Sequence, residues 1–191
     1  MAGTLASLIP TPLHPAVVHL PMALAVLVPL FAIGALIAVQ RGARPIRSWS
    51  IAVAMFLALS ASAWASIETG EDQEEKVERV VPEAAFETHE DAADLFLWLS
   101  VAVLGVATVG LLSSKIGAPA RVLATAGSLM LLVAGYRVGH SGGALVYTHG
   151  AASAYVDGAT AVPKAGALVP ADGSAAAKST RSGVDDDHDR H

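Results

Sequence analysis

Histidine is the residue type in this chain with the most capacity for chemistry. The chain has seven histidines and no cysteine in 191 residues. Five of the histidines lie beside the ends of long apolar runs: His14, His19, His89, His140 and His149. Imidazole is the commonest metal ligand among side chains and is costly next to lipid, so this set predicts a binding site.

The absence of cysteine narrows what such a site could hold. Without thiolates the chain cannot ligate an iron–sulfur cluster, attach a haem through thioether bonds or form a disulfide. Any metal must be bound by imidazole, carboxylate or backbone oxygen. The sequence also shows no Ser-His-Asp arrangement and no phosphate-binding loop, so we expect an electron carrier or binding protein rather than a stand-alone enzyme.

The apolar runs are long enough to cross a bilayer. Hydrophobic residues make up 53% of the chain and charged residues 15%, and the mean hydropathy is +0.54. Residues 1–40, 48–67 and 95–114 contain no charged residue, and about 20 apolar residues suffice to span a bilayer. A fourth run reaches spanning length if Pro119 opens its helix and Arg121 extends outward to water.

These runs predict an all-α, integral membrane four-helix bundle with up-down-up-down order. Residues 1–150 then form a four-span transmembrane domain. Residues 151–191 are rich in Ala, Gly, Ser and Pro, which predicts a disordered, low-complexity tail outside the cytoplasm.

Loop charges predict the orientation. The short loops at residues 40–48 and 113–121 are basic and contain no acid, whereas residues 68–94 contain many carboxylates beside Lys76 and Arg79. The positive-inside rule places the two basic loops in the cytoplasm. We therefore expect a multi-pass protein of the inner (plasma) membrane, with both termini and the histidines outside. The acidic outer face disfavours nucleic acid as a partner.

Local signals place the histidines on their helices. Pro15 suits the first position of a helix, and a residue before proline is held extended, as we expect for His14. Pro21 cannot donate a hydrogen bond to Val17, which predicts a bend beside His19.

The third and fourth spans carry signals of their own. Thr88 and Asp91 fit a capping box, which would put His89 in the first turn of the third span. Gly135, Gly139 and Gly143 recur every four residues, a spacing that leaves room for a helix or a flat ligand. Residues 144–149 are expected to be extended and to fold back over the bundle.

Four segments resemble a known family. They are LHPAVVHLPMAL at 13–24, ETGEDQEE at 68–75, THEDAADL at 88–95 and GHSGGALVYTHG at 139–150. Together they resemble the bacterial domain-of-unknown-function 2231 family. The resemblance covers residues 13–151 and implies a four-span inner-membrane protein. Relatives joined to cytochrome c or Rieske-type modules imply electron transfer, here with a separate redox partner of that kind.

Haem b is the preferred occupant of the predicted site. Two neutral imidazoles from different helices can bind the iron. The first and third spans lie diagonally in a bundle of this order, so we expect His19 and His89 to be the ligands. His140 and His149 would form a second ligand set or a lid, and Arg137 could pair with a haem propionate.

Two other interpretations remain open. One is a non-haem site for copper, zinc or iron, in which Glu68, Glu90 or Asp94 joins the imidazoles. The other is a structural or assembly subunit of a membrane complex, in which the histidines serve packing.

Overall fold

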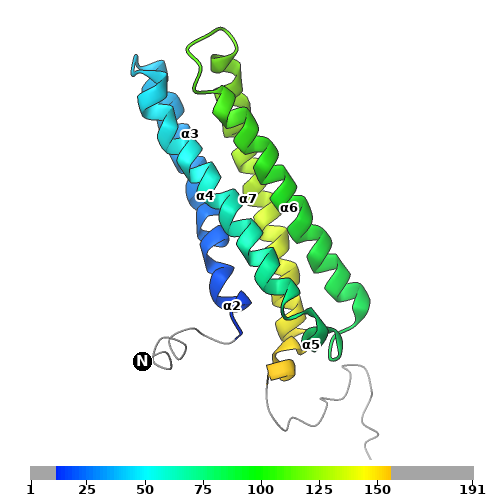
Figure 1. The fold of residues 1–191 in the computed structure, drawn as a ribbon. Helices are drawn as coiled ribbons and strands as arrows, with labels where there is room; N and C mark the ends of the chain where they lie inside the picture. Colours follow the sequence, from blue (N-terminus) through cyan, green and yellow to red (C-terminus); the bar gives the residue numbers. More distant parts are fainter. Residues whose placement is uncertain (1–11, 156–191) are drawn as a thin grey trace, which may run out of the picture.

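A bundle of long helices dominates the computed structural model, which describes residues 12–155 (Figure 1). The long helices in this range are α3 (His19–Gln40), α4 (Pro45–Glu71), α6 (Glu83–Val109) and α7 (Gly117–Tyr147). The short elements are α2 (His14–Val17), α5 (Glu74–Glu78) and the 3-10 helix η1 (Ala151–Tyr155). Within the described range four helical segments, the first running through α2 and α3, are long and apolar enough to cross a membrane. The predicted all-α, four-span bundle is confirmed.

The helices follow one another around the bundle. Helix α3 packs against α4 and α7, and α6 packs against the same two helices. The first and third spans are therefore diagonal, as predicted. Helix α4 has 27 residues and at 1.5 Å per residue is about 40 Å long, whereas the hydrocarbon core of a bilayer is about 30 Å thick. The helix ends thus reach the headgroup region, where polar side chains are tolerated.

The bundle interior is packed by a few large side chains among many small ones. Trp49, Phe56, Leu59 and Leu131 are fully buried, whereas many Leu, Ile and Val side chains on the outer faces are exposed. Such an apolar exterior is unfavourable in water and matches a lipid surrounding.

One end of the bundle carries the basic loops. We call it the basic end and define it by Arg41, Arg44 and Lys115, which are all exposed. The turn between α3 and α4 passes through Gly42 with φ 96°, a left-handed conformation that favours glycine. The opposite end, which contains α2, α5 and η1, is called the histidine end.

The prediction that Arg121 extends outward to water is wrong. Its side chain is buried, with 7% exposed. Its Nη1 donates to the carbonyl oxygens of Gly110 at 2.6 Å and Leu112 at 3.3 Å. The last carbonyls of a helix have no partner within that helix, and here the end of α6 gains its donor from α7. Trp49 assists from α4, because its Nε1 donates to Ala107 O at 2.8 Å.

The predicted capping box at Thr88 is also wrong. Helix α6 begins at Glu83, directly after Pro82, and Thr88 Oγ1 donates back to Ala84 O at 2.6 Å. His89 therefore lies in the second turn. The pair Pro82–Glu83 is itself a helix-start signal, because proline cannot donate to a preceding turn and a carboxylate suits the N-terminus.

Two segments expected to be extended are helical. His14 begins α2, with Leu13 in the αR region before it, although a following proline disfavours that conformation. The helical turn is accompanied by a hydrogen bond between the His14 ring and the backbone oxygen of Ser66 on α4. Helix α7 continues through residues 144–147, and the chain turns only at Gly150, with φ 73°.

The first residues of the predicted tail are folded. Ala151 in η1 is buried in a small cluster with Val81 and Leu145. The remainder of the predicted tail, residues 156–191, lies outside the described residues.

Candidate functional site

A cavity of about 650 Å³ lies at the histidine end, between α2, α4, α6 and α7. Most of its walls are apolar, including Val18, Met22, Phe86, Phe96 and Val138. Pockets of about 300 to 1,000 Å³ with apolar walls and a few placed polar groups are typical binding sites for small molecules and cofactors.

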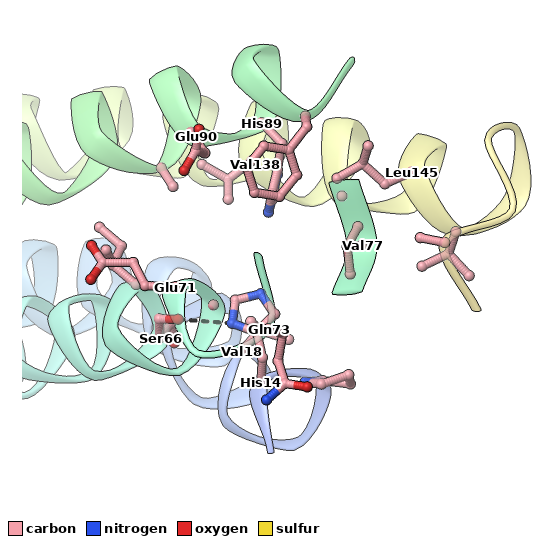
Figure 2. Close-up of a pocket in the computed structure, with 18 of the residues that line it drawn as sticks. His14, Val18, Ser66, Glu71, Gln73, Val77, His89, Glu90, Val138 and Leu145 are labelled. Carbon is pink, nitrogen blue, oxygen red and sulfur yellow. Dashed lines mark hydrogen bonds between the residues drawn. The ribbon is translucent and has the colours of Figure 1, made fainter. Parts of the chain in front are cut away.

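Two histidines face each other in this cavity. His14 on α2 and His89 on α6 come from diagonal sides of the bundle, and Figure 2 shows their rings turned toward one another. The ring centroids are 6.5 Å apart and the ring planes meet at 82°. The rings are therefore nearly perpendicular, and neither stacks on the other.

The hydrogen bond of His14 shows which of its two ring nitrogens carries the hydrogen and which has a lone pair. Its Nδ1 lies 2.8 Å from the backbone oxygen of Ser66, marked by the dashed line in Figure 2. A carbonyl oxygen can only accept, so Nδ1 carries the hydrogen and donates. In the neutral ring the lone pair is then on Nε2.

The same tautomer follows for His89. Its Nδ1 lies 2.9 Å from Ser141 Oγ, and this hydroxyl donates to Val138 O at 3.0 Å. Because the hydroxyl hydrogen is used toward Val138, Ser141 accepts from His89 Nδ1–H. Both rings therefore carry a lone pair on Nε2, which is the atom that a metal ion would bind.

Glycines make room for both rings. A Cβ at Gly70 would lie 3.2 Å from His14 Cε1, and a Cβ at Gly142 would lie 3.0 Å from His89 Cε1. Both distances are tighter than ordinary contact. A Cβ at Gly143 would meet nothing within 4 Å, so the evenly spaced glycines of the sequence pattern are not the ones that serve the histidines.

The structure does not bring His19 to His89. His19 is exposed on α3 and lies outside the cavity wall. The cause is helical phase: at 100° per residue, positions five apart in the sequence point about 140° away from each other. If His14 faces the interior, His19 faces outward.

The other predicted site residues are also separate from the pair. His140 is exposed and stacks on Tyr136, with centroids 5.9 Å apart and an interplanar angle of 17°. Arg137 and His140 line a second, smaller hollow between α6 and α7. His149 is half-buried beyond the end of α7.

Carboxylates line the cavity beside the histidines. Glu71 from α4 and Glu90 and Asp94 from α6 belong to its wall, and Figure 2 labels the first two. Glu68 is exposed and lies outside it. Within residues 12–155, no three His, Asp or Glu side chains gather closely enough to hold a metal ion together. Partial burial raises the pKa of Tyr155, which also lines the cavity.

Two groups that hold the histidines were missed by sequence reasoning. Ser66 acts through its backbone oxygen, for which a sequence carries no signal. Ser141 acts through its hydroxyl, and its position directly after His140 gave no indication that it contacts a histidine on another helix.

The cavity and both histidines lie in a segment that matches a known family. The family model described as "Predicted membrane protein (DUF2231)" matches residues 10–154. The chain belongs to the DUF2231 family. Comparisons with curated proteins and with solved structures gave no match.

Membership of DUF2231 confirms the resemblance drawn from the four sequence segments. In this DUF2231 chain the first segment supplies His14, and the last supplies Ser141 and Gly142, which position His89. The family description and the four apolar helices together identify a multi-pass membrane protein in contact with lipid.

Proposed function

We propose that the cavity binds haem b, that His14 and His89 would hold its iron, and that the protein carries electrons at the membrane. The observation that carries this proposal is the fixing of both Nδ1 atoms by hydrogen bonds. Imidazoles that ligate metals almost always donate their other N–H to a carbonyl, carboxylate or similar acceptor, which sets the tautomer and the ring orientation.

The separation of the rings fits two ligands on one metal ion. A metal about 2 Å from each of two imidazole nitrogens places the ring centres roughly 6 Å apart. The observed distance between the centroids is 6.5 Å. The apolar walls and the volume of about 650 Å³ are suited to a flat macrocycle.

The donor set favours haem over a non-haem metal site. Two protein ligands can hold the haem iron of an electron carrier, and the facing histidines would provide two. Structural zinc sites use four protein ligands and catalytic ones three, whereas the described residues contain no group of three. Copper, zinc or iron bound with help from Glu90 or Asp94 is the competing outcome.

When bound, haem would supply one-electron exchange. Ser66 and Ser141 orient the histidine rings through their hydrogen bonds. Phe86, Phe96 and Val138 line the cavity and keep water away from a bound group. A drier surrounding strengthens the hydrogen bonds that hold the ligands. Arg137 lines the neighbouring hollow and not this cavity, so we assign it no contact with a haem propionate.

The proposed site also has an orientation in the membrane and a partner. By the positive-inside rule, the basic end faces the cytoplasm and the cavity faces the outer side of the inner membrane. Helix α5 supplies Val77 to the cavity wall and carries Glu74, Glu75 and Glu78, of which Glu75 pairs with Arg79. This acidic surface would suit the basic patch of a soluble redox protein, of the cytochrome c or Rieske type.

The test is an absorption spectrum of detergent-purified protein made with an adequate haem supply. We expect a Soret band that shifts and sharpens on reduction with dithionite, together with about one iron per chain. A preparation without a Soret band that contains stoichiometric copper, zinc or non-haem iron would contradict the proposal.

A further inference from the structure

A second hollow adjoins the histidine cavity. It has a volume of about 550 Å³ and lies between α6 and α7. Ala92, Leu95 and Ala134 form its apolar part, and Asp91, Arg137 and His140 form its polar part.

The hollow opens toward the bilayer. Leu95 and Tyr136 line it and are 57% and 68% exposed on the outer faces of spanning helices. A molecule that enters from this side must first dissolve in lipid. The occupant is therefore expected to have an apolar tail and a polar head near the headgroup region.

A stacked aromatic pair lines one side of the hollow. Tyr136 and His140 stack in near-parallel planes, 17° apart. Hydrogen-bonding groups come from both sides, with His140 and Arg137 on α7 and Asp91 on α6. This arrangement suits a planar ring with oxygen atoms at opposite edges.

The side chain of Ser141 connects the hollow to the histidine pair. Ser141 lines the hollow, and its Oγ accepts the hydrogen bond from His89 Nδ1 at 2.9 Å. Asp91 belongs to the walls of both cavities. A ring in the hollow would lie beside a group bound at His89.

We propose that this hollow binds the head of a membrane-soluble quinol, which is the electron donor of the protein; the inference rests on the proposed haem site. Oxidation of one quinol to quinone releases two electrons and two protons. Both protons leave by way of the exposed His140 imidazole to water at the membrane surface. A haem held by His14 and His89 would accept the two electrons one at a time, and the soluble redox partner would be the final oxidant for both. A phospholipid phosphate would meet the Asp91 carboxylate as well as the Arg137 guanidinium, whereas an uncharged quinol head meets no like charge.

Equilibrium dialysis of detergent-purified protein against the short-chain quinone decylubiquinone tests the site without relying on haem. We expect saturable binding, weakened roughly tenfold by His140→Ala or Tyr136→Ala, as loss of one good contact implies. The control is Tyr147→Ala on the same helix, because Tyr147 is 91% exposed and lies outside both cavities. His14→Ala should remove the Soret band or change it to that of a five-coordinate haem, and should leave quinone binding unchanged.

The experiment distinguishes failure of the quinol site from failure of the proposed haem site. Two results would overturn this inference alone: a protein with a Soret band but no saturable quinone binding, or Tyr136→Ala and His140→Ala variants that bind quinone as tightly as the unsubstituted protein. A phospholipid that co-purifies and is lost on Arg137→Ala, with no quinone bound, would overturn it in favour of a lipid site. Quinone binding without any Soret band would overturn the proposed haem function and the electron step with it.

Discussion

The behaviour of the His14–His89 pair depends on single atoms around each ring. The two Nδ1 atoms are held by Ser66 O and Ser141 Oγ, and the ring of His89 is accommodated by the missing Cβ of Gly142. Small changes at these neighbours should therefore alter cofactor retention without removing a ligand.

Gly142→Ala tests this at the residue scale. The added Cβ would lie 3.0 Å from His89 Cε1, so the ring must shift, and we expect haem per chain to fall several-fold. Gly143→Ala is the matched control, because its Cβ meets open space. It should keep full haem content and gain about 0.5–1 kcal/mol of stability from the better helix propensity of alanine. Equal haem content in the two variants would argue against the fit described for His89.

Sequence reasoning identified the right residue types but not the right pair. His89 and His14 were both candidates, yet the choice between His14 and His19 depends on the phase of the chain across Val18, where α2 passes into α3. That phase is set by tertiary contacts such as the bond from His14 to Ser66 O. The periodicity of an apolar run cannot reveal it, because such a run is hydrophobic on every face.

At the scale of the elements, the ends of helices were harder to predict than the helices themselves. The spans followed from hydrophobic length alone, since backbone groups in lipid must be paired within a helix. Their ends depend on partners from other helices. Arg121 illustrates this, because its guanidinium serves carbonyls of α6 rather than water.

Arg121→Ala is the corresponding prediction for the basic end. Truncation removes the donor from Gly110 O and Leu112 O, and leaving such buried groups unsatisfied costs about 1–3 kcal/mol. We expect a lower Tm in detergent, measured by circular dichroism, with the haem spectrum of the folded protein unchanged. Lys115→Ala, at an exposed residue of the same end, should leave the Tm as it is. A Tm for Arg121→Ala equal to that of the unsubstituted protein would refute the role given to this side chain.

At the scale of the whole molecule, the proposal needs the histidine end to face away from the cytoplasm. The chain has no cysteine, so single-cysteine variants can be labelled cleanly in intact cells from which the outer membrane has been removed. Gln73→Cys near the cavity should react with a membrane-impermeant maleimide, and Lys115→Cys at the basic end should react only after lysis. The reverse labelling would contradict the orientation, although the histidine pair itself would be unaffected.

The most direct test of the central claim is the haem content of three purified variants that differ only at histidine: His14→Ala, His89→Ala and His19→Ala. His14 and His89 face each other in the cavity, whereas His19 is exposed on α3. All three variants should insert normally, because the four apolar helices remain. The account predicts that the Soret band disappears, or changes to that of a five-coordinate haem, in His14→Ala and His89→Ala, and that it is unchanged in His19→Ala. Loss of haem in His19→Ala together with full, six-coordinate haem in His14→Ala would contradict the account.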